Sequence, residues 1–237
     1  MSDHNSFIDS LETVLVPVHR DGHKFIIIAF FLTLGMFWLW MPLGWIFAII
    51  TMWVYYFFRD PERVTQTREG LIVAPADGKI TGVDEVLPPK ELGLGEDPVI
   101  RISTFLSIFD VHIQRSPVAG DIKEVVYTPG LFVNAVLDKA SEDNERNGVV
   151  IEDRQGNKIG VVQIAGLIAR RILCFVKEGE GIGVGERYGL IRFGSRVDVY
   201  LPKGKVAQVS VGQKAIGGET IFADLNSDEG EREARTH

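Results

Sequence analysis

The dipeptide Gly194-Ser195 stands in the segment Arg192-Phe193-Gly194-Ser195-Arg196, in a part of the chain rich in β-type residues. In a tight turn between strands, the Ser195 hydroxyl can attack the Gly194 carbonyl and convert the amide into an ester. Elimination would then cut the chain and leave Ser195 as a pyruvoyl group, an electrophilic carbonyl that no coded side chain supplies. Most Gly-Ser pairs are plain turns, so other residues must support this chemistry.

Two residues could assist the serine. His112 is the only histidine between Lys24 and Thr236, and alternation places it on the opposite face of a strand from its apolar neighbours. Asp77 follows a strand-like run in Ala76-Asp77-Gly78-Lys79. The three supply a nucleophile, a base and an orienting carboxylate. A structural histidine and an ordinary Asp-Gly turn are the plainer alternatives. A hydrolase triad also stays open, although Ser195 lacks the Gly-x-Ser-x-Gly elbow.

Composition excludes several classes of site. With one isolated histidine and a single cysteine, Cys174, we expect no metal site and no internal disulfide. Cys174 lies in an apolar run and is interpreted as a buried strand residue, in a reducing compartment. The net charge of −7 and the lack of a basic face argue against nucleic-acid binding.

An uncharged run covers residues 25–58 and contains all four tryptophans. As one straight helix it would reach about 51 Å, well beyond a hydrocarbon core of about 30 Å. The motif Met41-Pro42-Leu43-Gly44 at its midpoint should break it, because proline removes a helix hydrogen bond and glycine permits a turn. The run therefore predicts a membrane-associated helical hairpin.

Basic residues flank this run on both sides, at Arg20, Lys24, Arg59 and Arg63. By the positive-inside rule, both ends then lie at the cytoplasmic face of the cell membrane. A signal peptide is disfavoured, because the run is too long and no cleavage site follows. A buried core helix pair remains an alternative. Residues 1–24 carry apolar side chains at helical spacing, which predicts an amphipathic segment lying on the bilayer.

After Arg59 the pattern changes to short β-type runs separated by glycines, which predicts an antiparallel β domain over 59–225. The expected strands cover residues 71–74, 99–105, 149–152, 159–164 and 171–176. A helix is expected over 132–144. Residues 226–237 are charged and lack large apolar residues, which predicts a disordered tail.

The β domain contains an internal repeat of the form Val-x-x-Gly, five residues, Gly-Glu. Its two copies, 33 positions apart, are Val176, Gly179, Gly185, Glu186 and Val209, Gly212, Gly218, Glu219. The pattern resembles the half-motifs of biotinyl and lipoyl carrier domains. The predicted fold class is therefore α+β and mainly β, with a barrel-sandwich-like antiparallel catalytic domain behind the N-terminal helical hairpin.

The chain resembles the short bacterial phosphatidylserine decarboxylase proenzymes over nearly its whole length. The stretches that carry the resemblance are 57–63, 75–79, 109–117, 139–148 and 189–198. Longer members of the family have Leu-Gly-Ser-Thr at the processing site, whereas this chain has Phe193-Gly194-Ser195-Arg196, as the short members do. A role for that threonine cannot be transferred, but the Gly-Ser pair is kept.

The resemblance implies self-cleavage between Gly194 and Ser195, with Ser195 becoming a covalent pyruvoyl cofactor. The products are a large β chain, 1–194, and a small α chain, 195–237, which stay together as a heterodimer and could pair further as a homodimer. The pyruvoyl group would form a Schiff base with phosphatidylserine at the membrane and release carbon dioxide to give phosphatidylethanolamine. Asp77 would hold the His112 imidazole in place. The imidazole would accept the Ser195 proton during cleavage and later protonate the substrate carbanion.

Arg170 and Arg171 follow an apolar segment and could bind the lipid phosphate, although a solvated basic pair is an equal alternative. Two other functions stay open. A membrane-anchored, non-enzymatic carrier-like or adaptor module would share the repeat and the anchor, but needs a lysine at a hairpin tip, where only Lys203 and Lys205 are near. A pyruvoyl enzyme with a soluble substrate would have no use for the hairpin.

Overall fold

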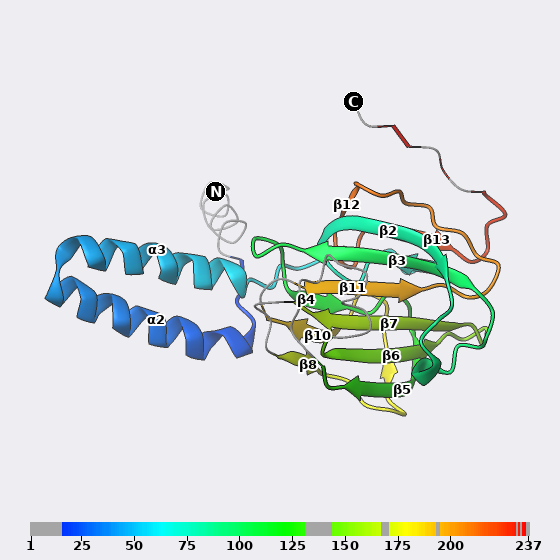
Figure 1. Ribbon diagram of the computed structural model, residues 1–237, viewed down its shortest axis with the longest axis horizontal. Helices are drawn as coiled ribbons and strands as arrows, with labels where there is room; N and C mark the ends of the chain where they lie inside the picture. The colour runs from blue at the N-terminus through cyan, green and yellow to red at the C-terminus, as the bar shows by residue number, and fades with distance from the viewer. Residues whose placement is uncertain are drawn as a thin grey trace, which may run out of the picture. The chain divides into compact units, whose positions relative to one another are not determined.

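The computed structural model describes residues 16–130, 144–166, 171–192, 195–230, 232, 234 and 235. The helix expected over 132–144 lies outside the described residues apart from its last position, as do the apolar positions of the predicted N-terminal surface helix. The chain forms two compact units, residues 1–62 and 63–237. The described part of the first unit is helical, and the second is built mainly from strands (Figure 1).

The first unit is a helical hairpin of α2 (Arg20–Leu39) and α3 (Met41–Phe57). The chain breaks at Trp40, whose extended backbone (φ −165°, ψ 120°) lies directly before the predicted Met41–Gly44 motif. Pro42 fits the first turn of α3, where the missing N–H would have no helical partner. The proline that ends one helix thus also begins the next.

The two helices contact each other through small residues. The ring of Phe37 lies so close to Gly44 that a side chain at position 44 would clash with it. Thr33 and Thr51 approach across the pair with a hydroxyl–hydroxyl distance of 2.9 Å. Most large apolar side chains of the hairpin point outward and are exposed, with Trp38 90% exposed. By length and composition, α2 could cross a membrane, and α3 is a shorter apolar helix; both features favour membrane association.

The second unit contains three antiparallel sheets in the described residues. Their strands are β1 (Leu71–Val73), β2 (Gly78–Val86), β3 (Val99–Leu106), β4 (Ile113–Arg115), β5 (Gly120–Thr128), β6 (Arg146–Glu152), β7 (Lys158–Ala165), β8 (Ile172–Cys174), β9 (Gly181–Ile182), β10 (Arg187–Ile191), β11 (Ser195–Tyr200), β12 (Lys214–Ala215) and β13 (Ile221–Asp224). The large sheet has the order β12-β2-β3-β11-β7-β6-β5-β9, the second β4-β10-β8, and the third β1-β13. The predicted class, α+β and mainly β, is confirmed.

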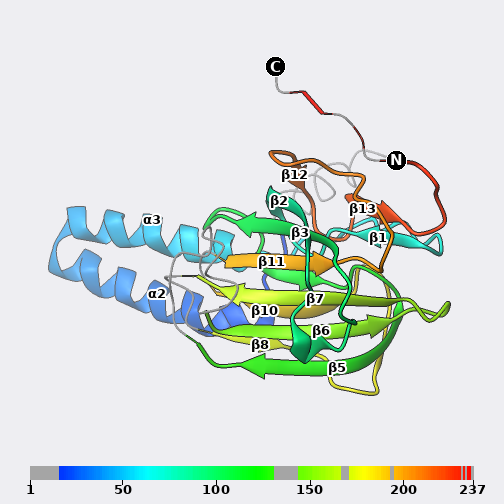
Figure 2. The same ribbon diagram turned by 45° about the vertical axis from the view of Figure 1, so that its right-hand side comes forward.

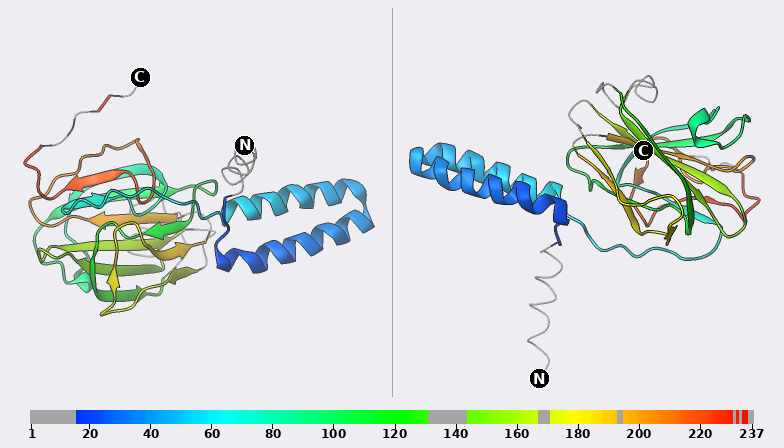
Figure 3. Two further views of the ribbon diagram at one scale, coloured as in Figure 1. Left: turned by 180° about the vertical axis from the view of Figure 1, so that it is seen from behind. Right: turned by 90° about the horizontal axis from the view of Figure 1, so that it is seen from below.

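The large sheet is curled into a half-barrel (Figures 2 and 3). Its inward face buries an apolar core that includes Val161, Val197 and Val199 and extends to the β4-β10-β8 sheet through Ile191. Its outward face has a smaller apolar cluster, covered by Leu92 of the short 3-10 helix η1 (Lys90–Leu92). Because both faces of its central strands are covered, those strands are almost fully buried.

The internal repeat is present in the backbone. All four repeat glycines have positive φ: Gly179 (83°), Gly185 (76°), Gly212 (96°) and Gly218 (82°). This conformation explains the glycine spacing, since other residues rarely adopt it. Gly179 N donates to Ile122 O, and Gly212 N donates to Ile80 O, each at 2.8 Å. The two copies therefore make equivalent contacts to β5 and β2, as two similar structural units should.

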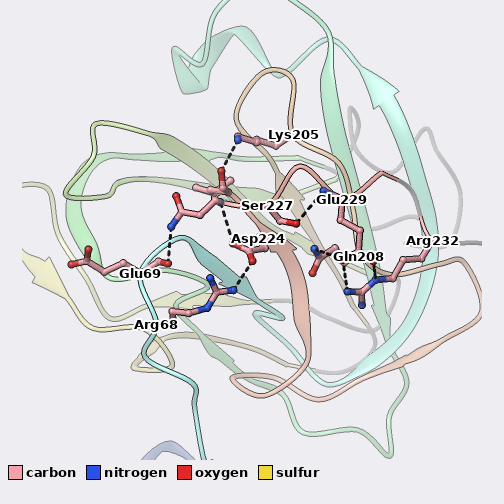
Figure 4. A network of polar contacts seen from close by, with 10 residues as sticks. Arg68, Glu69, Lys205, Gln208, Asp224, Ser227, Glu229 and Arg232 are labelled. Atoms are coloured by element: carbon pink, nitrogen blue, oxygen red, sulfur yellow. Dashed lines mark hydrogen bonds and ion pairs between the residues drawn. The ribbon is translucent and has the colours of Figure 1, made fainter.

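Polar contacts tie the C-terminal strand to the beginning of the β domain (Figure 4). Arg68 pairs with Asp224 at the end of β13. The Asn226 side chain donates to Glu69 O at 3.0 Å, so the first residue of the predicted disordered tail is hydrogen-bonded. Positions 231, 233, 236 and 237 of that tail lie outside the described residues. Segments about 157 positions apart in the sequence are thus held together at this edge of the domain.

Candidate active site

Ser195 is the first residue of β11, the strand that lies between β3 and β7 in the large sheet. It pairs with Leu106 on one side and Ala165 on the other. Its position alternates with those of Val197 and Val199, which places its side chain on the inward face. The residue is fully buried, and its Oγ has no hydrogen-bond partner among the described residues. Three other hydroxyls of the described residues, those of Ser103, Thr104 and Tyr188, share this state, and Ser195 differs from them in following the Gly194 carbonyl that its Oγ could attack.

His112 lies just before β4 and is fully buried. Its ring Nδ1 is 2.9 Å from the carbonyl oxygen of Asp110, which fixes the orientation of the ring. Its own carbonyl oxygen accepts from Ile191 N at 3.3 Å. Ile191 is the last residue of β10 and precedes Ser195 by only four positions. The backbone of His112 is therefore attached to the strand that leads into the Gly194-Ser195 peptide.

Asp77 lies in the turn between β1 and β2, and both of its carboxylate oxygens accept hydrogen bonds. Arg63 donates to Oδ2 at 2.7 Å, and Gly217 N donates to Oδ1 at 2.8 Å. Burial raises the pKa of Asp77 above its ordinary value of 3.8; the nearby Asp110 charge acts in the same direction, and Arg63 opposes both. These contacts do not test the expected interaction of Asp77 with the His112 imidazole, which stays a prediction.

The turn after β3 connects the three predicted residues. β3 ends at Leu106, opposite Ser195, and the chain then turns through Ser107 and Asp110, whose N–H donates to Ser107 O at 2.9 Å. Asp110 contacts the His112 ring through its carbonyl, and its charge influences the pKa of Asp77. The fold therefore brings Ser195, His112 and Asp77 to the same end of the half-barrel.

The other predicted positions are only partly described. Gly194 and Arg170 lie outside the described residues. Arg171 is exposed, and its carbonyl oxygen accepts from Arg192 N at 3.3 Å, three positions before Ser195. Its backbone thus lies beside the entry to the processing segment, and a phosphate-binding role for it stays a prediction.

A buried ion pair lies on the opposite face of β11. Arg196 and Asp198 alternate with the inward residues, and the guanidinium donates to the carboxylate at 2.8 Å. Their side chains are only 3% and 0% exposed. The ion pair therefore lies on the outward face of β11, whereas the Ser195 hydroxyl lies on its inward face.

Sequence reasoning missed several buried polar residues around this end of the half-barrel. Arg63, which binds Asp77, stands among charged residues that look like a solvated linker. Gln114, Asn147 and Gln163 are buried amides on strands β4, β6 and β7. Their positions could have been flagged, because an amide at an inward position of an apolar strand needs an internal partner.

No cluster of three or more His, Cys, Asp or Glu side chains suited to a metal ion occurs in the described part of the chain. The candidate site offers a buried hydroxyl, an oriented imidazole and a carboxylate with a raised pKa. Such a set can move a proton from a serine hydroxyl and back to a reacting atom.

The chain is similar to known proteins over most of its length. The sequence model of the phosphatidylserine decarboxylase family matches residues 50–223. The phosphatidylserine decarboxylase proenzyme of Cereibacter sphaeroides is 56% identical over 225 residues, which cover 95% of this chain and 97% of the relative. Asp77, His112 and Ser195 all lie within residues 50–223. The chain therefore belongs to the phosphatidylserine decarboxylase family.

Proposed function

We propose that this chain is a proenzyme that cuts itself between Gly194 and Ser195 and then decarboxylates phosphatidylserine to phosphatidylethanolamine. The family supports the decarboxylase activity. The observation that carries the self-processing step is the buried Ser195 Oγ, which has no hydrogen-bond partner among the described residues at the start of the central strand β11.

The cleavage uses the chain's own atoms. His112 accepts the Ser195 proton while Oγ attacks the Gly194 carbonyl carbon, and the peptide C–N bond gives way to an ester. Loss of the Ser195 α-proton and of the ester oxygen leaves a carboxylate on Gly194 and a dehydroalanine at position 195. One water molecule then replaces the nitrogen of that residue, which leaves as ammonia, so position 195 becomes a pyruvoyl group.

The residues at this end of the half-barrel suit such a group. Position 195 is buried between two strands, and its amide to Arg196 stays in the sheet after cleavage. When present, the pyruvoyl group supplies a carbonyl that captures the substrate amine and accepts electrons as carbon dioxide leaves. His112 returns a proton to the substrate carbon, and Asp77, once ionised, stabilises the imidazolium. Burial excludes bulk water from these transfers.

The hairpin fits a lipid substrate. α2 and α3 expose apolar side chains over most of their surfaces, as a segment in a bilayer does. Basic residues at both ends favour placement at the cytoplasmic face of the cell membrane. Arg170 and Arg171 are candidates to bind the lipid phosphate.

The cleavage products should stay associated. After the cut, β11 and β13 belong to the small chain, while β3, β7 and β1 belong to the large chain. β11 is hydrogen-bonded on both edges, and Arg68 and Glu69 of the large chain contact Asp224 and Asn226 of the small one (Figure 4). A heterodimer of the two chains follows from these pairings.

A denaturing mass measurement tests the proposal. The wild-type protein should give two chains, 1–194 and 195–237, the smaller beginning with a pyruvoyl group, while Ser195→Ala stays intact at 26.4 kDa. Ser210→Ala is a matched control, because Ser210 lies in a surface turn. An undivided, active wild-type chain would refute self-processing. An undivided wild-type chain that also fails to decarboxylate would instead reopen the carrier-like alternative.

A further inference from the structure

Three buried amide side chains form a continuous hydrogen-bonded chain inside the half-barrel. Asn147 on β6 donates from Nδ2 to Oε1 of Gln163 on β7 at 3.1 Å. Gln163 donates from Nε2 to Oε1 of Gln114 on β4 at 2.9 Å. Gln114 donates from Nε2 to the carbonyl oxygen of His112 at 2.8 Å. All three amides are at most 2% exposed.

The direction of this amide chain is fixed by its last member. A backbone carbonyl can only accept, so Gln114 must present its NH2 group to His112. The Gln114 oxygen then faces Gln163, which must donate, and the Gln163 oxygen in turn accepts from Asn147. Hydrogen bonds that point the same way strengthen one another, so the polarisation ends on the His112 carbonyl.

The strand β10 leaves room for this amide chain at Gly189. A Cβ atom at that position would lie 2.4 Å from Nε2 of Gln163 and 2.8 Å from Leu173 O. Gly189 has no positive φ, so the glycine serves close approach rather than an unusual backbone. It is also the register partner of Gln114. The amide of Gln163 therefore passes directly over the strand that runs to the processing segment.

The amides stand where hydrocarbon would pack well. Two residues further along the same strands, on the same inward face, Val149 and Val161 form the buried core. Burying an amide is favourable only if its groups are paired, and each such hydrogen bond adds about 1 kcal/mol net. Valine or leucine at these three positions would therefore stabilise the domain about as well as the amides do. What the amides add is orientation.

We propose that Asn147, Gln163 and Gln114 are positioning residues that hold His112 in place for proton transfer at Ser195. The amide chain joins His112 to β6 and β7, and β7 pairs with β11 at Ala165 and Ser195. It thereby fixes the base relative to the nucleophile across two sheets. This inference rests on the proposed role of His112.

Gln163→Glu and Gln163→Met test the direction of the amide chain. When the introduced carboxyl is protonated, its O–H can donate to Gln114 and the chain is complete. When it is ionised, it can only accept, so Gln114 loses its donor or turns its own oxygen toward the His112 carbonyl. Burial raises the pKa of such a carboxyl toward neutrality. Methionine matches glutamine in size but has no donor at any pH.

The measurement is the rate of self-cleavage during cell-free synthesis, together with decarboxylation by the purified, cleaved protein on phosphatidylserine vesicles. Relative to wild type at the same pH, Gln163→Glu should lose at least about tenfold more rate at about pH 8 than at about pH 6. Gln163→Met should show a uniform loss with the wild-type pH profile. Parallel profiles for both substitutions, or wild-type rates in both, would overturn the positioning role.

Gly189→Ala covers the case in which neither substitution at Gln163 folds. It displaces the Gln163 amide and adds no polar group, so cleavage should slow without a new pH dependence. Wild-type cleavage in this variant would refute the inference. Normal cleavage and turnover in His112→Ala would instead refute the proposed function at the base itself, whatever the Gln163 variants do.

Discussion

The inward face of the half-barrel has two different ends on the same strands. Toward the end of β7 and the start of β11, it carries Gln163, Ser195 and, on β3, Thr104. Toward the other end, the corresponding positions hold only apolar residues such as Val161 and Val199. The same strand register runs through both ends, which therefore share the spacing of their side chains and differ in side-chain chemistry. One end stabilises the domain by burial, and the other uses burial to hold polar groups that water would otherwise solvate.

The largest expected effect comes from removing charge at the polar end without changing shape. Asp77→Asn should slow self-cleavage by about 10²–10⁴-fold, because an imidazolium at His112 would lose its carboxylate. Gel-based cleavage kinetics measure this loss. Asp84→Asn is a matched control, since Asp84 also bonds an arginine, Arg101, at 3.2 Å but lies toward the far end of β2. Equal rates in the two variants would remove Asp77 from the mechanism.

The pH dependence of the wild-type protein sharpens the same contrast. The pKa of Asp77 is raised, and the carboxylate acts only when ionised, so cleavage should be lost as pH falls through a value above 3.8. Its contribution to stability has the opposite sign. The folded state binds the proton more tightly than the unfolded chain, so protonated Asp77 favours folding, and this contribution is lost as pH rises through the raised pKa. A cleavage midpoint at or below 3.8 would contradict the assignment.

The outward face of β11 should affect stability rather than chemistry. Asp198→Asn removes the charge of the carboxylate that the buried Arg196 guanidinium contacts, which costs about 3–5 kcal/mol. Urea unfolding of the uncleaved Ser195→Ala background gives the change in free energy. The double substitution Arg196→Met with Asp198→Leu should recover most of the loss, because replacing a buried pair by apolar residues is nearly neutral. A loss below about 1 kcal/mol would place the pair among weak surface bridges.

The smallest effect is expected at the apolar end. Val199→Ala removes two buried methyl groups and should lower the free energy of unfolding by about 2 kcal/mol, measured in the same urea assay. The folded fraction should cleave at the wild-type rate. A slowed cleavage rate in fully folded protein would show that the two ends are coupled and would break the distinction between them.

Much of the architecture could be predicted because it depends on local features. The positive φ of Gly179 and Gly212 requires glycine, so the repeat was visible in the sequence as glycine spacing. The break at Trp40 follows from the proline two positions later. Ser195 and His112 could be chosen as candidates because the chain has one Gly-Ser pair and one histidine between Lys24 and Thr236.

The partners of those residues could not be predicted in the same way. Gln163 and Gln114 are 49 positions apart in sequence, and Gly217 reaches Asp77 across 140 positions. The hydrogen-bond partner of an amide or a backbone N–H cannot be identified from the sequence, because many equivalent groups could form the same bond. Only the folded arrangement of the sheets selects one of them.

The sequence by itself determined which residues could react, where the chain turns and which face of each strand is apolar, since these depend on residue type and on neighbours a few positions away. The tertiary structure decided which hydroxyl lost its solvent, which carbonyl holds the His112 ring and which amides align behind it. Burial and orientation depend on contacts between distant strands, and those contacts exist only when the whole half-barrel has formed.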